Sequence, residues 1–154
     1  MRESTIVVVD DSPDHLELIS MALEGSCPSQ EVLTFGEGAQ ALDYLLARGP
    51  HAGRDTTVQP RLVILDLKMV RMDGLEVLRT LRNHPRTAAV PVVVHSSSVE
   101  KEDVARSYAA GASGYVRKAT SFDELRQRMR ALCEQWLAPG AAAATPGPTP
   151  APAA

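Results

Sequence analysis

The chain has 154 residues, of which 44% are hydrophobic and 23% are charged, with a formal net charge of −3. This length and composition indicate one ordinary globular domain with a hydrophobic core. The slightly acidic balance argues against a nucleic-acid partner, which normally needs a basic face, and the apolar stretches are too short for a membrane span.

Histidine and cysteine provide no obvious metal site. The four histidines are scattered along the chain, without the spacing of metal ligands. The two cysteines, Cys27 and Cys133, are far apart, and the first four residues lead into an apolar run and not into a secretory signal. We therefore expect a cytoplasmic protein with two free thiols.

The first half of the chain alternates strand-like and helix-like segments. The run "TIVVVD" at 5–10 predicts a buried strand, and Ser12 and Pro13 then predict a helix start, with serine as the N-cap. A weaker strand, "EVLTF" at 31–35, is followed by a second helical stripe of alanine and leucine. A polar loop rich in glycine and proline occupies residues 47–60.

The second half continues the alternation. We expect strands at 61–66, 90–95 and 114–118, and helices at 74–83 and about 99–110. Either Ser97 or Ser98 is expected to cap the second of these helices. The last helix opens at Ser121, and Glu124 completes a capping box.

Five strand–helix units follow from this pattern. The strands are continuously apolar, as strands are when helices cover both faces of a parallel sheet. The predicted fold is therefore an α/β, doubly wound, five-stranded parallel sheet. We assign residues 1–138 to this domain and residues 139–154, which contain only Pro, Gly, Ala and Thr, to a disordered tail.

Charged and polar residues stand at the carboxyl ends of the predicted strands, where such sheets bind ligands. These residues are Asp10, Asp11, Asp66, Ser96 and Lys118. Three carboxylates repel one another unless a cation is present, and Mg²⁺ suits an all-oxygen ligand set. Lysine and serine can stabilise an oxyanion next to the metal, so the pattern indicates a phosphoryl site, with Asp66 as its acceptor.

The same segments resemble the receiver domains of two-component response regulators, over about residues 4–137. The resemblance rests on four motifs in order: "VVVDDSPDHLELI", "VILDLKMVRMDGLEVL", "PVVVHSSS" and "GASGYVRKA". It implies the flavodoxin-like strand order 2-1-3-4-5. It also implies a signalling protein that takes a phosphoryl group from a histidine kinase and is not an enzyme in the usual sense.

The resemblance further implies a role for each residue at the site. Asp66 is the phosphoacceptor, Ser96 and Tyr115 are the switch residues, and Lys118 is the ion partner of the phosphoryl group. The Mg²⁺ ligands are Asp10, Asp11, Asp66 and the backbone carbonyl of Lys68.

Two positions depart from the family pattern. Val70 stands where proline is usual, which predicts a less rigid loop after the acceptor. Ala119 stands where a proline with a cis peptide bond is usual. Because a cis bond before alanine costs about 3–4 kcal/mol, we expect the Lys118–Ala119 bond to be trans.

The last helix carries an apolar stripe whose first half is expected to pack on the sheet. Its second half is long for a domain of this size, and an apolar end on a surface helix predicts a homodimer contact. The candidate contact residues are Phe122, Met129, Cys133 and Trp136.

The sequence thus predicts a single-domain response regulator that signals through protein contacts. Its long loop and extended last helix resemble regulators paired with phytochrome-type kinases, so a bacteriophytochrome is a candidate partner.

Three alternatives to this function remain. One is an aspartate-nucleophile phosphatase, although Lys68 occupies the position of its second acid. Another is a flavodoxin-like cofactor module, although "DDSPD" repels phosphate. The third is a receiver fold that is not phosphorylated.

Overall fold

The computed structural model describes residues 4–137, so the predicted tail at 139–154 lies outside the described residues. The strands are β1 (Ser4–Val9), β2 (Gln30–Phe35), β3 (Leu62–Leu65), β4 (Val92–Ser96) and β5 (Gly114–Arg117). The helices are α1 (Pro13–Ser26), α2 (Gly38–Leu45), α3 (Gly74–Arg82), α4 (Lys101–Ala109) and α5 (Phe122–Trp136), with a 3₁₀ turn, η1, at Gly49–His51.

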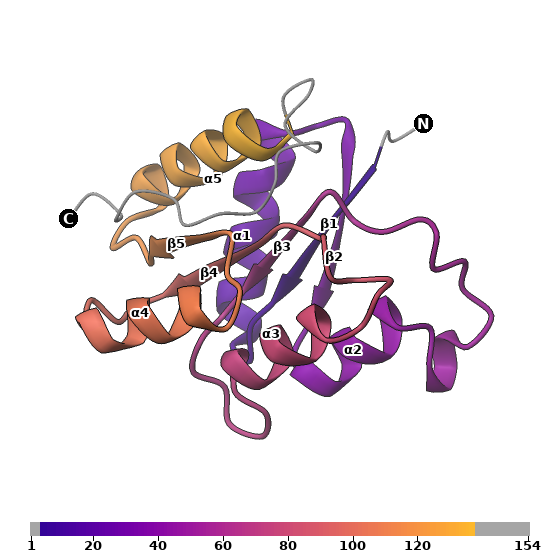
Figure 1. Ribbon diagram of the computed structural model, residues 1–154. Coiled ribbons are helices and arrows are strands. Elements are labelled where there is room, and N and C mark those ends of the chain that lie inside the picture. The colour runs from indigo at the N-terminus through magenta and orange to yellow at the C-terminus, as the bar shows by residue number, and fades with distance from the viewer. Residues whose placement is uncertain (1–3, 138–154) are drawn as a thin grey trace.

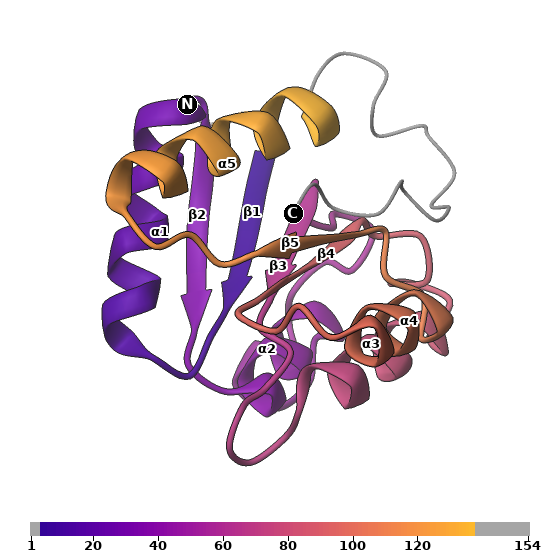
Figure 2. The same cartoon turned by 90° about the vertical axis from the view of Figure 1, so that its left-hand side faces the viewer.

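The five strands form one parallel sheet in the order β2-β1-β3-β4-β5. Helices α1 and α5 cover one face, and α2, α3 and α4 cover the other (Figures 1 and 2). The predicted fold class and strand order are confirmed. The order brings β1 and β3 together at the centre, so the segments after these two strands lie side by side.

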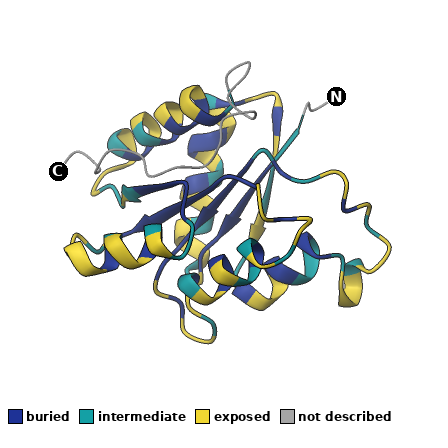
Figure 3. Cartoon of the chain, viewed as in Figure 1, coloured by how far each residue is buried: buried dark blue, intermediate teal, exposed yellow. Residues whose placement is uncertain are grey.

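The core lies on both faces of the sheet, as the continuously apolar strands predict. Successive residues of β1 alternate between the two faces, with Val7 and Val9 in the cluster under α2–α4 and Ile6 and Val8 in the cluster under α1 and α5. Figure 3 shows the inner strands buried and the helices exposed on their outer sides. The sheet is therefore a rigid support for the loops at its carboxyl edge.

Helix starts agree with the sequence in two cases and differ in a third. The side chain of Ser12 accepts a hydrogen bond from the His15 N–H, and that of Ser121 accepts one from the Glu124 N–H. Helix α4, in contrast, has Glu100 as its N-cap, without a side-chain cap bond. The expected serine cap of α4 is wrong, because the chain stays extended beyond Ser98.

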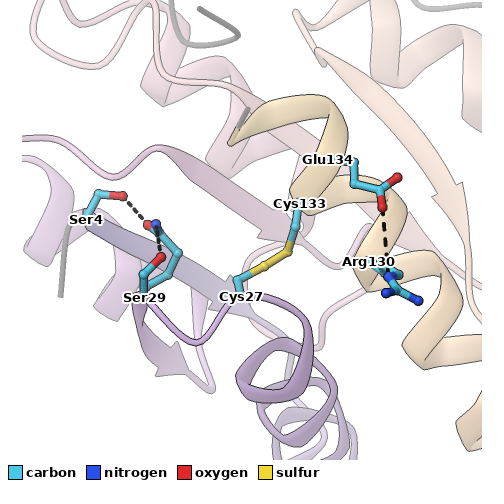
Figure 4. Close-up of a disulfide and its surroundings, with 7 residues drawn as sticks. Ser4, Cys27, Ser29, Arg130, Cys133 and Glu134 are labelled. Carbon is cyan, nitrogen blue, oxygen red and sulfur yellow. Dashed lines mark hydrogen bonds and ion pairs between the residues drawn. A yellow bond between two sulfur atoms is a disulfide. The ribbon is translucent and has the colours of Figure 1, made fainter. Parts of the chain in front are cut away.

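The two cysteines are paired, so the expectation of two free thiols is wrong. Cys27, just after α1, and Cys133, in α5, form a disulfide whose Cα atoms are 6.4 Å apart (Figure 4). The pairing results from the packing of α1 beside α5 on one face of the sheet. A separation of 106 residues gave no indication of this proximity in the sequence.

The predicted dimer surface on α5 is mostly inside the domain. Met129, Cys133 and Trp136 are buried in the cluster that α5 shares with α1 and the sheet. Phe122 is the exception, with 37% of its surface exposed. The apolar stripe faces the core from Leu125 to Trp136, so Phe122 is the one of the four candidates that lies on the surface of the described residues. The homodimer itself stays a prediction.

Two further expectations concern the backbone and the membrane. None of the peptide bonds between residues 4 and 137 is cis, so the Lys118–Ala119 bond is trans as predicted. Among the described helices, none combines the length and apolar character that crossing a membrane requires.

Candidate phosphoryl and metal site

Three carboxylates meet at the carboxyl edge of the sheet. Asp10 and Asp11 follow β1, and Asp66 follows β3, the neighbouring strand. One oxygen from each of the three lies within 4.8 Å of the others. Asp10 and Asp66 are buried, whereas Asp11 is exposed to solvent. The sequence predicted this meeting correctly, because parallel strands end at the same edge.

Backbone hydrogen bonds fix the two loops that carry these acids. The Asp66 N–H donates to the Val9 carbonyl at 2.9 Å, which extends the β1–β3 pairing up to Asp66 itself. The Asp11 carboxylate accepts a hydrogen bond from the Val70 N–H at 3.1 Å. The loop after β1 is therefore joined to the loop after β3 by a donor that the proline usual in the family would lack, because proline has no backbone N–H.

Gly74, the first residue of α3, allows the chain to turn tightly behind Asp66. A Cβ atom at this position would lie 2.3 Å from the Asp66 carbonyl oxygen. The Gly74 N–H donates to the Leu67 carbonyl at 2.8 Å. Only glycine permits this close backbone approach, and the turn sets the direction in which the loop after β3 leaves the sheet.

Lys118 brings a positive charge from β5 to the carboxylates. Its Nζ lies 3.0 Å from Asp10 Oδ2 and 3.4 Å from Asp66 Oδ2. The Lys118 N–H donates to the Ser96 carbonyl at 2.8 Å, which places the lysine at the end of the sheet. Its ammonium group is mostly enclosed, so it interacts with the acids in a partly desolvated setting.

His15 is a member of the site that the sequence interpretation missed. Its Nδ1 lies 3.2 Å from Lys118 Nζ and 3.5 Å from Asp10 Oδ2. The residue stands in the first turn of α1, directly after the acidic pair. Its position three residues after the N-cap Ser12 is the signal in the sequence, and the spacing of the histidines from one another does not contain it.

Burial controls the protonation of Asp66. It raises the pKa of Asp66 to about 6, an effect to which Asp10 adds and which Lys118 opposes. The backbone N–H of Lys68 also hydrogen-bonds this carboxylate and favours its charged form. In the absence of a cation, the site therefore holds a proton on Asp66 more readily than an exposed aspartate does.

Ser96, the last residue of β4, and Tyr115, in β5, are linked through the loop after β4. Both residues are buried. The Ser96 hydroxyl accepts a hydrogen bond from the Ser98 N–H at 3.1 Å, and the Tyr115 hydroxyl donates to the Ser98 carbonyl at 2.9 Å. The two predicted switch residues thus both hydrogen-bond to the backbone of Ser98, in the loop after β4.

These features agree with the comparison to known families. Residues 6–130 match the model of the response regulator receiver domain. The chain belongs to this family. This match includes β2 to β5, most of β1 and the whole acidic site.

Several relatives of this receiver domain are themselves short regulators. A probable methanogenesis regulatory protein, FilR2 of Methanothrix harundinacea, is 34% identical over 86% of this chain and 83% of its own length. The response regulator Rcp1 of Synechocystis is 28% identical over 86% and 88%. The crystal structure of the phosphorylated cyanobacterial phytochrome response regulator RcpA has a TM-score of 0.81 and 32% identity, covering 88% of this chain and 95% of that one.

The donor atoms of this receiver domain fit a hard divalent cation. Three carboxylates supply oxygen ligands at one point. One of them, Asp10, also forms an ion pair with the Lys118 ammonium group. A solved structure of Rcp1, 27% identical with a TM-score of 0.78, is described as its Mn(2+)-bound form. The three carboxylates of this chain are the kind of ligand set that an oxygen-seeking divalent ion prefers.

Proposed function

We propose that this receiver domain is a single-domain response regulator that accepts a phosphoryl group on Asp66 from a histidine kinase, in a reaction that depends on Mg²⁺. One observation carries the proposal: the buried Asp66 carboxylate lies 3.4 Å from the Lys118 ammonium and within a cluster of carboxylate oxygens spanning 4.8 Å. An acceptor, a cation site and a fixed positive charge are the parts that phosphoryl transfer needs.

In the proposed reaction, an Asp66 carboxylate oxygen attacks the phosphorus of a phosphohistidine. A P–O bond forms and the P–N bond breaks. The second ring nitrogen of the phosphohistidine carries a proton, so the kinase imidazole leaves as the neutral base. Lys118 would stabilise the charge on the phosphoryl oxygens, and the Ser96 hydroxyl would hydrogen-bond one of them. When bound by Asp10, Asp11, Asp66 and the Lys68 carbonyl, Mg²⁺ would neutralise the remaining negative charge and keep Asp66 ionised.

The partner is proposed from the relatives. RcpA is named as a phytochrome response regulator, and it shares 32% of its sequence with this chain. We infer a phytochrome-type histidine kinase, acting in the cytoplasm, as the phosphoryl donor. The signal then leaves through protein contacts on the domain surface. The proposal does not include a homodimer through α5, since three of its four predicted contact residues are buried.

The phosphatase alternative lacks a residue that its chemistry requires. An aspartate-nucleophile phosphatase protonates its leaving group with a second acid two residues after the nucleophile, and Lys68 stands there. A receiver fold that works without phosphorylation would need no ordered acceptor, yet Asp66 and its partners are all present and close together.

Intact-mass measurement after incubation with Mg²⁺ and acetyl phosphate tests the proposal. We expect one phosphoryl adduct that disappears in EDTA and in Asp66→Asn. Asp14→Asn is the matched control, because Asp14 is an exposed acid near the site that contacts none of its ligands. An adduct that survives in Asp66→Asn would identify another acceptor. Failure to bind both a phosphoryl group and beryllofluoride would support the binding module that is not phosphorylated.

A further inference from the structure

Helix α4 is held to the domain in an unusual way. The residues that it buries, Asp103 and Ser107, are both polar. A surface helix normally packs through a stripe of large apolar side chains, but here Val104 and Tyr108 are only partly buried against the core. Polar contacts therefore contribute much of what fixes the N-terminal half of α4.

Asp103 is the centre of those contacts. Its Oδ2 accepts a hydrogen bond from the Ser98 hydroxyl at 2.5 Å, and the same oxygen lies 3.5 Å from Lys68 Nζ. The Tyr115 hydroxyl donates to the carbonyl of the same serine. One carboxylate thus joins α4 to the loop after β4 and to the loop after β3, which carries the acceptor aspartate.

Lys68 is a flexible link between the acceptor and this helix. It follows Asp66 by two residues, and 71% of its side chain is exposed, whereas the Asp103 side chain is only 11% exposed. The charge of Asp66 is already matched by Lys118 at 3.4 Å, so Lys68 is available to pair with α4 before phosphorylation. Because the lysine is so exposed, its pair with Asp103 is weak and can be displaced.

We propose that Asp103 is a positioning residue that holds Lys68 away from the acceptor and that a phosphoryl group on Asp66 competes with it for this lysine. The inference rests on the proposed function of Asp66. A phosphoryl group brings further negative charge and several acceptor oxygens within reach of Lys68. When Lys68 moves to it, Asp103 loses an ion pair, and the contact that holds α4 weakens.

The lifetime of the phosphoaspartate should report this competition. A lysine held over the phosphoryl group shields the acyl phosphate from water and slows its hydrolysis. Asp103→Asn frees Lys68, so we expect a decay about twofold to fivefold slower than that of the unmodified protein. Lys68→Met removes the shield, and we expect its decay to be faster.

The test is a double-mutant cycle on the decay of the adduct, followed by intact mass after the phosphodonor is removed. In the Lys68→Met background, Asp103→Asn should change the rate no further. Glu102→Gln is the matched control, because Glu102 is an exposed acid on the same helix that pairs with Arg106; its decay should equal that of the unmodified protein. If Asp103→Asn changes the decay rate equally in the unmodified protein and in Lys68→Met, the proposal is overturned.

Amide hydrogen exchange gives a second readout, independent of hydrolysis and of the folding of Asp103→Asn. Beryllofluoride should increase exchange in α4 in the unmodified chain and leave it unchanged in Lys68→Met. The same increase in both proteins would overturn the proposal. An adduct that forms on Asp66 but decays at one rate in all variants would overturn only this inference. If no adduct forms on Asp66, both the proposed function and this inference are overturned.

Discussion

Asp66 carries a charge that the metal-free site accommodates poorly. Its pKa is about 6 when folded, against an ordinary 3.8. Between these values the unfolded chain releases a proton that the folded chain keeps, so stability falls as pH rises and remains lower above pH 6. This penalty reflects burial first and the neighbouring Asp10 second, and a bound cation would offset it.

Asp66→Asn should therefore stabilise the metal-free protein above pH 6 and have little effect at pH 4. We expect a gain of about 1–3 kcal/mol at pH 7.5 from the removed penalty. Urea unfolding in EDTA at the two pH values measures it, and adding Mg²⁺ should reduce the gain. A gain of the same size at both pH values would show that charge is not the cause.

His95 has the opposite dependence on pH. It is buried next to the site, its Nε2 has no hydrogen-bond partner within residues 4–137, and burial lowers its pKa from 6.5 to about 4. The unfolded chain takes up a proton below pH 6.5 that the folded chain refuses. The stability of the fold with a neutral His95 is therefore fully present above pH 6.5, and it is lost as the pH falls towards 4.

His95→Gln should remove this acid sensitivity. Relative to the variant, the unmodified protein should lose up to about 3 kcal/mol of unfolding free energy between pH 7 and pH 4. Glutamine does not titrate, and Asp66 is present in both proteins. The difference between their unfolding free energies at each pH therefore reports the titration of His95 alone. The interpretation is wrong if the two urea unfolding curves shift in parallel with pH.

At the scale of elements, Arg82 joins the end of α3 to two neighbouring loops. Its guanidinium donates to the carbonyls of Val90 at 2.7 Å and Gly111 at 2.8 Å and to the Ser113 hydroxyl at 3.3 Å. Gly111 has a φ of +106°, a conformation that suits glycine. One side chain therefore fixes the chain before β4 and the turn before β5.

Arg82→Lys should destabilise the domain by about 2–3 kcal/mol, because a lysine cannot reproduce the planar set of donors and leaves carbonyls unpaired. Arg79→Lys is the control, since Arg79 is exposed on the same helix. Urea unfolding of the two variants at one pH measures the difference. Equal stabilities would show that these hydrogen bonds contribute little.

At the scale of the whole molecule, the Cys27–Cys133 disulfide joins the end of α1 to the end of α5. Its two cysteines are 106 positions apart in the sequence, so the loop that it closes is most of the domain. A cross-link over so long a loop lowers the conformational entropy of the unfolded chain. In the chain-entropy model this raises the free energy of unfolding by about 4–5 kcal/mol. The bond is therefore expected to contribute a large share of the stability of a domain this small.

Cys133→Ser, or dithiothreitol added to the unmodified protein, should lower the unfolding free energy by about 3–5 kcal/mol. Thermal or urea unfolding with and without the reductant provides the measurement. Dithiothreitol should have no effect on the Cys133→Ser variant, which is its internal control. The same stability under oxidising and reducing conditions would contradict the prediction.

Much of the site could be predicted because it depends on the common direction of the parallel strands. Asp10, Asp66 and Lys118 stand at the ends of parallel strands, and every such end lies at one edge of the sheet. The periodicity of apolar residues was enough to place them there. His15 and Asp103 were missed because their roles depend on the rotation of α1 and α4 about their own axes, which the strand pattern does not set.

The sequence by itself determined the fold class, the strand order through family resemblance, and the acids that meet, since these depend on local periodicity and on the direction of the strands. Only the tertiary structure decided the contacts between helices. It paired Cys27 with Cys133, buried Trp136 in the core, and brought Asp103 to Lys68. Such contacts join residues far apart in the chain, and they follow from side-chain packing, which no local pattern encodes.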